Sequence, residues 1–361
     1  MTITSDILII GGGISGMLTA RELRLAGRNV TIIDKSATGQ ESSWAGGGIL
    51  LPIYPWRQAP AISKLVSLSL KKFPGLSQEL RLATGIDPEW RDCGMLICKN
   101  PDFAKAVAWC HDYHIDWHPP EQQVLADLHT QLQQPLWLPG IAQIRNPRLL
   151  QALKANLLNL GVTFLENTAI QRIDTRQRRI TRLLTSTASF SLQQLVICSG
   201  AWTNNVLQTL LPGTVELPIQ PVKGQMLVFA AQPDTLPCMV LDGDHYLIPR
   251  RDGKILAGST VEVSGFDKST TNSAKQALYE FATQLLPVLK ESELIHHWAG
   301  LRPGTPEGIP YIGFHPDFDN LSINAGHFRN GLVMSPASAQ LLADLILERP
   351  LAIDPSPYAL T

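Results

Sequence analysis

The feature that most constrains the fold is one uninterrupted run over residues 5–34, SDILIIGGGISGMLTARELRLAGRNVTIID. It combines an apolar strand, a glycine turn, an amphipathic helix, a second strand and a terminal acid, which together form a dinucleotide-binding unit. Gly11 allows the tight turn, Gly13 lets the backbone approach a pyrophosphate, and Gly16 lets the helix pack closely on the strand. The helix N-terminus then faces the phosphates, and Asp34 can accept hydrogen bonds from ribose hydroxyls. The unit predicts a bound dinucleotide, but it does not separate FAD from NAD.

Composition and charge exclude several classes of function. The chain has 361 residues, of which 44% are apolar and 17% charged, as expected for a soluble globular protein of about two domains. Lys and Arg number 30 against 31 Asp and Glu, so no overall field favours nucleic acid or an anionic membrane. The 5 cysteines are odd in number and form no CxxC pair, which indicates neither a disulfide framework nor a metal site. Without a basic leader or an apolar run of the ~18 residues that a membrane span needs, we expect a cytoplasmic protein.

The order of elements predicts an α/β protein with a discontinuous nucleotide domain. Three separate segments show alternating strand and helix patterns. They are the N-terminal region, a region that begins with Asn146 as the N-cap of a helix, and the C-terminal region. Between the second and the third of these segments, residues 217–259 have the pattern of a β-rich segment. We therefore expect a doubly wound, Rossmann-like domain and a second, mostly antiparallel β-sheet domain. The expected boundaries are 1–55, 146–205 and 310–361 for the first domain, and 56–145 and 206–309 for the second.

Local patterns also predict individual elements. Apolar spacing and caps predict helices over residues 59–84, 103–113, 273–286 and 332–347. The wholly apolar run that ends in Gly200 predicts a strand buried on both faces. Because ligands of doubly wound sheets bind beyond the carboxyl ends of the strands, we expect several turns to converge on the cofactor. These are the turns after Ile10, Asp34, Cys198 and Ala325.

Four further stretches are more specific than the glycine turn. They are PVKGQ at 221–225, HYLIPRRDG at 245–253, WAGLRPGTPEGIPYIG at 298–313 and GHFRNG at 326–331. With the N-terminal fingerprint, they resemble the glycine oxidase branch of the D-amino-acid oxidase family, and the resemblance runs through nearly the whole chain. It implies FAD as the cofactor and a D-amino-acid oxidase-like arrangement of an FAD-binding domain and a substrate domain.

The resemblance places three catalytic residues. In the family, the arginine of the LRP motif, here Arg302, holds the substrate carboxylate over the flavin. A guanidinium suits this role because it offers two parallel hydrogen bonds and stays charged when partly desolvated. Tyr246 is expected to bond the carboxylate and wall the site, and Arg329 to lie near the substrate and the flavin. His245 points the other way from Tyr246 on a strand, so we do not expect it to act as a base.

The fingerprint and the resemblance together give the expected FAD contacts. The loop over residues 40–52 is rich in small residues, as a loop must be if its amides are to approach a large flat ligand. Covalent relatives use a cysteine near the LRP motif, and this chain has none after Cys238, so we expect non-covalent FAD. The expected FAD-binding residues are Gly11, Gly13, Ile14, Ser15 and Gly16 at the phosphate turn, Asp34 and Lys35 at the ribose, Ser42, Ser43, Gly47, Gly48 and Ile49 near the pyrophosphate and flavin, Ile170 at the adenine, Gly200 after its strand, and His327, Phe328, Arg329, Asn330, Gly331, Leu332 and Val333 at the pyrimidine end of the flavin.

The implied reaction is oxidative deamination of glycine, sarcosine or small D-amino acids, with hydride passing from the α-carbon to FAD and then O2 giving H2O2. The resemblance adds a role in supplying the imine used for the thiazole of thiamine. Two alternatives stay open: a dehydrogenase that reduces a quinone or other acceptor, and a flavin-binding subunit that needs another chain. Family members commonly self-associate. Pocket walls vary in the family at Asp244, His245, Val261 and Glu262, which leaves the preferred side chain open.

Overall fold

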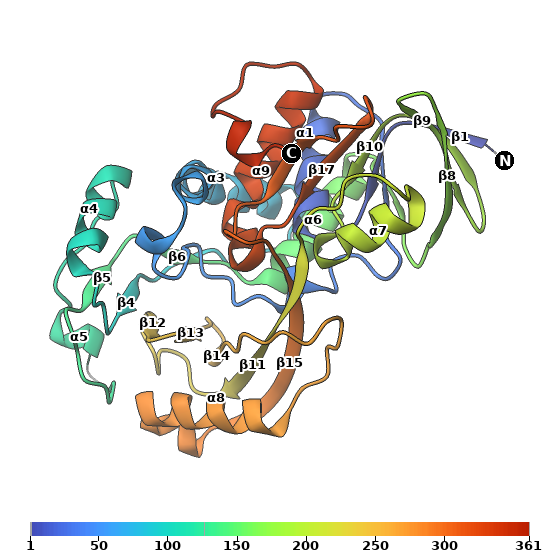
Figure 1. Ribbon diagram of the computed structural model, residues 1–361. Helices are drawn as coiled ribbons and strands as arrows, with labels where there is room; N and C mark the ends of the chain where they lie inside the picture. Colours follow the sequence, from blue (N-terminus) through green and yellow to red (C-terminus); the bar gives the residue numbers. More distant parts are fainter. Residues whose placement is uncertain (1, 126, 361) are drawn as a thin grey trace.

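The protein contains two large sheets joined by long strands (Figure 1). The computed structural model describes residues 2–125 and 127–360. The strands of the first sheet are, in spatial order, β16 (Tyr311–Phe314), β17 (Leu321–Ala325), β10 (Ser189–Ile197), β1 (Thr2–Ile10), β2 (Val30–Ile33) and β7 (Thr163–Leu165). All neighbours are parallel except β16 with β17, and an antiparallel pair, β8 (Ile170–Arg176) and β9 (Arg179–Thr185), extends from β10. This is the expected doubly wound sheet, so the predicted fold class is confirmed.

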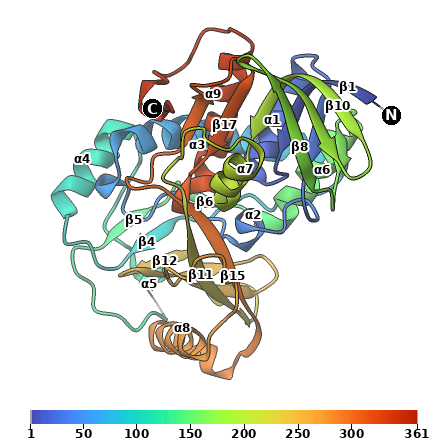
Figure 2. The ribbon, with the colours of Figure 1, turned by 45° about the vertical axis from the view of Figure 1, so that its right-hand side comes forward.

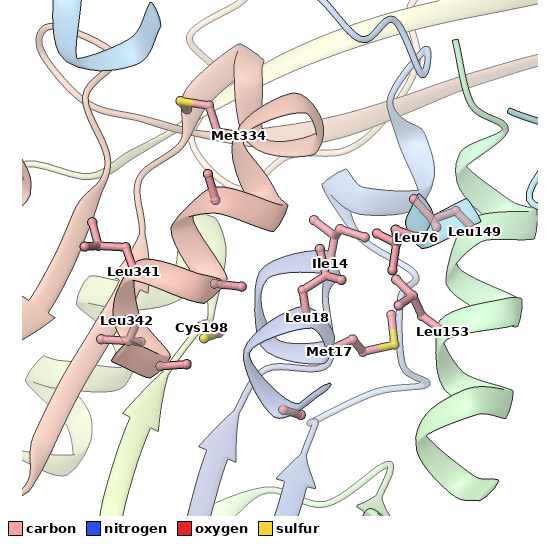
Figure 3. Close-up of a cluster of buried hydrophobic side chains, with 14 of the residues drawn as sticks. Ile14, Met17, Leu18, Leu76, Leu149, Leu153, Cys198, Met334, Leu341 and Leu342 are labelled. Carbon is pink, nitrogen blue, oxygen red and sulfur yellow. The ribbon is translucent and has the colours of Figure 1, made fainter. Parts of the chain in front are cut away.

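One face of this sheet is covered by four helices: α1 (Ile14–Leu25), α3 (Pro60–Thr84), α6 (Asn146–Asn159) and α9 (Gly331–Ile346). Figure 3 shows Met17 of α1 directed toward Leu153 of α6, with Leu341 and Leu342 projecting from α9 on the other side of α1. All four side chains are buried in one apolar cluster. The opposite face packs against α7 (Thr203–Leu210). The helix that begins at the glycine turn is therefore fixed on several sides by apolar packing.

The second sheet has the order β15 (Glu293–Gly304), β11 (Gln220–Ala230), β14 (Lys254–Gly258), β13 (His245–Pro249), β12 (Met239–Asp242), β4 (Met95–Ile97) and β5 (Leu136–Leu138). Every neighbouring pair is antiparallel except β12 with β4. One face is covered by α8 (Asn272–Leu285), and the other carries Tyr246 and Ile248 in a cluster with Trp109 of α4 (Phe103–Tyr113). Figure 2 shows β11 and β15 as one long pair that reaches up to the first sheet.

The remaining elements are short. They are α2 (Ser42–Ala45), β3 (Arg91–Asp92), α5 (Gln122–Leu125), β6 (Ala142–Gln143) and the 3-10 helices η1 (Pro55–Arg57), η2 (Gly200–Trp202), η3 (Pro287–Glu291), η4 (Phe328–Asn330) and η5 (Ser356–Tyr358). No helix in residues 2–125 or 127–360 is both long and apolar enough to cross a membrane. The same part of the chain holds no group of His, Cys, Asp and Glu arranged to bind a metal ion.

The four predicted helices are present within one or two residues of their expected ends. One cap was assigned wrongly: α6 begins at Asn146 itself, so Arg145 is its cap residue. The Asn146 amide instead donates a hydrogen bond of 2.7 Å to the backbone carbonyl of Ser43. The side chain thus fastens the loop after β2 rather than its own helix. The expected domain boundaries stay a prediction, and α3, which lies inside the expected second domain, packs with α1, α6 and α9 in the apolar cluster of the first sheet.

Candidate active site

A cavity of about 440 Å³ lies where the two sheets meet. The turns after β1, β2, β10 and β17 converge on it, because Ile10, Asp34, Cys198 and Ala325 all line its wall. From the second sheet it receives Tyr246 of β13 and Arg302 of β15, and Arg329 comes from η4. The cavity therefore brings together the three residues predicted to be catalytic.

All but one of the predicted FAD-binding residues line the same cavity. The exception is Gly16, where an added Cβ would lie 2.0 Å from the carbonyl oxygen of Gly11. Gly16 therefore acts by letting α1 approach the strand end. The lining residues are Gly11, Gly13, Ile14, Ser15, Asp34, Lys35, Ser42, Ser43, Gly47, Gly48, Ile49, Ile170, Gly200, His327, Phe328, Arg329, Asn330, Gly331, Leu332 and Val333. Their placement is observed, and their contacts with FAD stay predictions.

The wall at the start of α1 has the form of an anion site. The cap residue of α1 is Gly13, which has no side chain, and the first turn of the helix contains no acidic residue. The backbone N–H of Ile14 donates to Ser43 Oγ at 2.9 Å, which holds the loop over residues 40–52 against the helix N-terminus. Gly48 has φ +85°, and a Cβ there would lie 2.0 Å from the carbonyl oxygen of Ile144. A pyrophosphate fits this wall because helix N-termini favour negative charge.

The end of β2 offers a partly used carboxylate. Asp34 Oδ2 accepts from the N–H of Gly12 at 2.8 Å, and Oδ1 accepts from the N–H of Ser36 at 2.9 Å. Each carboxylate oxygen has further lone pairs for ribose hydroxyls. Beside it, Lys35 Nζ lies 4.1 Å from the centre of the Trp202 ring, a cation–π distance that fixes both side chains at the cavity wall.

Arg302 is fixed at the opposite end of the cavity by the pairing of β11 with β15. Its Nη1 donates to the carbonyls of Lys223 and Thr260 at 3.3 and 3.1 Å, and its Nη2 donates to Ser259 Oγ at 2.8 Å. The guanidinium lies over Gly224, where an added Cβ would come 2.1 Å from Nη2. Burial, opposed by Tyr246 and reinforced by Arg329, lowers the pKa of Arg302, but an arginine stays charged at neutral pH.

Tyr246 forms a wall beside this guanidinium. Its residue exposure is 7%, and its hydroxyl lies 3.9 Å from Met226 Sδ. Both Gly47 and Gly258 approach the ring edge so closely that an added Cβ would lie 3.4 and 3.1 Å from Tyr246 Cε2. The position of the ring is therefore set by the loop over residues 40–52 on one side and by β14 on the other.

Arg329 and His327 lie just before α9. The Nη2 atom of Arg329 is buried and has no hydrogen-bond partner among the described residues. His327 lines the cavity, is buried, and places Nε2 3.1 Å from Ser338 Oγ. Burial lowers the pKa of His327 to about 4, so its ring is neutral at physiological pH. The orphaned guanidinium nitrogen is a donor available to a ligand in the cavity.

The residues expected to vary at the pocket wall lie elsewhere. Among the described residues that line the cavity, none is Asp244, His245, Val261 or Glu262. Val261 is 51% exposed, and the His245 ring packs on Phe281 with centroids 5.0 Å apart. The interpretation of these positions as wall residues was therefore wrong. Alternation on the strand had already predicted that His245 points away.

Several lining residues were missed. Asn146 had the pattern of a helix cap, and Ser259 follows a strand without a local signal of its role. Each acts through a partner distant in sequence, Ser43 for the first and Arg302 for the second. The other unpredicted lining residues include Glu41, Leu51, Ile53, Trp202 and Asn205.

Comparison with known proteins agrees with the geometry. Residues 6–345 match the family described as DAO, FAD dependent oxidoreductase. The chain is 44% identical to the glycine oxidase of Pseudomonas aeruginosa and 42% identical to that of Pseudomonas putida, covering 98% and 99% of this chain and 98% of each relative. It is 32% identical to the bifunctional protein ThiO/ThiG of Synechocystis, over 97% of this chain and 52% of that protein. The crystal structure of glycine oxidase from Geobacillus kaustophilus superposes with a TM-score of 0.92 at 27% identity, covering 99% of this chain and 98% of that one.

Proposed function

The chain belongs to the family of FAD-dependent oxidoreductases, and from that premise we propose that it oxidises the α-carbon of glycine, sarcosine or small D-amino acids. The single observation that carries the substrate class is the fixed guanidinium of Arg302 at one end of the cavity. An arginine has five N–H donors. Three are used by Lys223, Thr260 and Ser259, which leaves the two that a bidentate carboxylate takes.

The cavity residues fit FAD. The start of α1, whose cap residue Gly13 has no side chain, suits the pyrophosphate. Asp34 suits the ribose, and the residues before α9 suit the flavin. When bound, FAD accepts the hydride and is reoxidised by an external acceptor. Of the five cysteines, Cys198 lines the cavity, and burial raises the pKa of its thiol to about 12. An un-ionised thiol is a poor nucleophile, which supports non-covalent FAD.

Two cations bias the protonation state of the substrate. Arg302 and Arg329 line the same cavity, and each carries a positive charge. Like charge disfavours an ammonium, whereas the substrate carboxylate is attracted. The amine therefore binds unprotonated, with its lone pair available to assist departure of the hydride. Catalysis then comes from orientation, since Tyr246 and Arg302 fix the carboxylate and so the face of the α-carbon.

We propose O2 as the acceptor and glycine as a substrate, with the imine product available for thiazole synthesis; the bifunctional ThiO/ThiG relative of Synechocystis supports that role. Purified protein should be yellow and should release one H2O2 per glycine consumed in air. Rapid dye reduction with negligible peroxide would favour a dehydrogenase. Protein that stays colourless after incubation with FAD would contradict the proposal. We also propose a cytoplasmic location, which cell fractionation would test. We propose self-association as well, and light scattering, which measures the molar mass in solution, would test it.

A further inference from the structure

The orientation of Arg302 depends on two backbone segments that meet beside it. One acceptor, the Lys223 carbonyl, belongs to β11, and the other two, Ser259 Oγ and the Thr260 carbonyl, follow the end of β14. A change in the spacing of these segments would therefore move the guanidinium. Beyond β14 the segment pairs with β11 only irregularly, so side-chain contacts add to the backbone hydrogen bonds that hold it.

Backbone contacts supply part of that hold. Lys223 and Glu262 exchange two N–H to carbonyl hydrogen bonds, each of 2.9 Å. The N–H of Gln225 donates to Thr260 Oγ1 at 2.9 Å, and the N–H of Thr260 donates to the Gln225 carbonyl at 3.3 Å. Residues 223–225 and 260–262 thus form a short irregular pairing directly behind the guanidinium.

The side chain of Glu262 joins both halves of this pairing. Its Oε1 accepts from Gln225 Nε2 at 2.8 Å and also from the hydroxyl of Thr260. Its Oε2 lies 3.3 Å from Lys223 Nζ. Burial alone would raise the pKa of Glu262, but the hydrogen bonds from Thr260, Gln225 and Lys223 outweigh it and hold the pKa below its usual value. The carboxylate is ionised at neutral pH and serves three donors at once.

The charge of Lys223 makes this carboxylate hard to replace. Lys223 is only 2% exposed, so its ammonium needs close compensation. Glu262 supplies it from a side chain 30% exposed, whereas the second carboxylate, Asp267, lies 3.5 Å away and is 54% exposed. Asp267 makes no hydrogen bond to Thr260 or Gln225 among the contacts of the described residues. The two carboxylates therefore share one partner but differ in whether they hold the segment after β14.

We propose that Glu262 is a positioning residue for Arg302, acting through Thr260, Gln225 and Lys223 to set the geometry of the carboxylate site. It does not line the cavity, so it touches neither substrate nor cofactor directly. The inference rests on the proposed function only in taking the Arg302 end as the site of the substrate carboxylate. It assigns a role in substrate capture to a residue outside the cavity.

The test compares Glu262→Gln with the matched control Asp267→Asn in the FAD-bound protein. Glu262→Gln should raise KM for glycine about tenfold and change kcat by less than about twofold, because the clamp that captures the carboxylate is displaced. The dissociation constant of acetate, read from the flavin absorbance, should rise by a similar factor. FAD content should stay that of the parent protein. Asp267→Asn should leave KM and acetate binding within about twofold.

Three results would overturn the proposal. The first is an unchanged KM and acetate affinity in Glu262→Gln, and the second is the same shift in Asp267→Asn. The third is a fall in FAD content, kcat and acetate binding together in Glu262→Gln, if the same fall is seen in the double variant that also carries Lys223→Met. That double variant removes the uncompensated buried cation, so it should keep FAD and still show the raised KM; a parental KM in it would equally contradict the proposal. Acetate binding separates the two questions, because it reports on the clamp even if the parent protein does not oxidise glycine.

Discussion

The two ends of the cavity are built in different ways. The cofactor end consists of backbone turns at the ends of parallel strands, where Gly13 caps α1 and Gly48 passes close to a carbonyl. The substrate end consists of side chains, chiefly Tyr246 and Arg302, whose positions follow from the register of an antiparallel sheet. Crowding at the first end meets backbone that cannot yield. Crowding at the second meets flexible side chains, so the fold survives while the chemistry changes.

The largest expected effect is at the cofactor end. Gly16→Ala would place a Cβ 2.0 Å from the Gly11 carbonyl oxygen, so α1 would have to move away from the strand end. Such overpacking costs about 3 kcal/mol or more, and bound FAD should be lost with it. Flavin absorbance of the purified variant measures this. Gly75→Ala in α3, where nothing lies within 4 Å of the added atom, is the control and should stay yellow. A fully yellow Gly16→Ala protein would contradict the account of this turn.

Arg302 should show the opposite behaviour, with FAD retained and activity lost. Arg302→Lys keeps the charge but loses the planar pair of donors, so kcat/KM for glycine should fall at least about tenfold. Arg302→Ala should lower it about 100-fold or more, because the carboxylate would enter the cavity without its counter-charge. An amine that lacks a carboxylate should be affected much less. Alanine at the exposed Arg172 of β8 is the control. Near-normal glycine kinetics in Arg302→Ala would remove the proposed clamp.

The buried His327 makes the cofactor end sensitive to acid. Burial lowers the pKa of its ring to about 4, below the value of about 6.5 in an unfolded chain. Between these pH values the unfolded state binds the extra proton, so stability falls as pH falls. Between pH 7 and pH 5 this protonation lowers the free energy of unfolding by about 2 kcal/mol. The His327→Gln variant should not show this loss of stability. Urea unfolding of the FAD-bound protein at both pH values measures it. The same pH difference in the parent and His327→Gln, with exposed His111→Gln as control, would refute the assignment.

The smallest expected effect comes from crowding at the substrate end. Gly224→Ala would bring a Cβ 2.1 Å from Arg302 Nη2, and the guanidinium would be displaced from its three hydrogen bonds. The expected loss is about tenfold in kcat/KM, or about 1.4 kcal/mol, with FAD content unchanged. Gly140→Ala, which meets nothing within 4 Å, serves as the control. If Gly224→Ala lost its FAD instead, the contrast between the two ends would fail.

The same contrast explains which parts of the site could be predicted from the sequence. The cofactor end follows from short runs, since Gly11, Gly13, Gly16 and Asp34 lie within one strand–helix–strand unit. Nothing in the local sequence shows that Lys223, Thr260 and Arg302 meet, because that requires the register of β11 with both β15 and β14. Resemblance of whole motifs, not periodicity, placed Arg302 and Tyr246.

The errors have the same origin. Asn146 and Pro147 have the pattern of a helix start, yet the amide serves Ser43 in a loop distant in sequence. Glu262 follows a strand end, as a wall residue would, yet its carboxylate turns back to Lys223 and Gln225. Both side chains were assigned from their neighbours in sequence, and both act on partners that only the folded chain brings near.

The central claim is that one carboxylate clamp sets which face of the α-carbon meets FAD. Anaerobic mixing of the FAD-bound protein with glycine, D-alanine or L-alanine, followed by flavin absorbance, tests it without assuming an electron acceptor. Bleaching by glycine and D-alanine, with L-alanine inert, is the predicted result. Equal rates of bleaching with D-alanine and L-alanine would contradict the clamp and the substrate orientation built on Arg302.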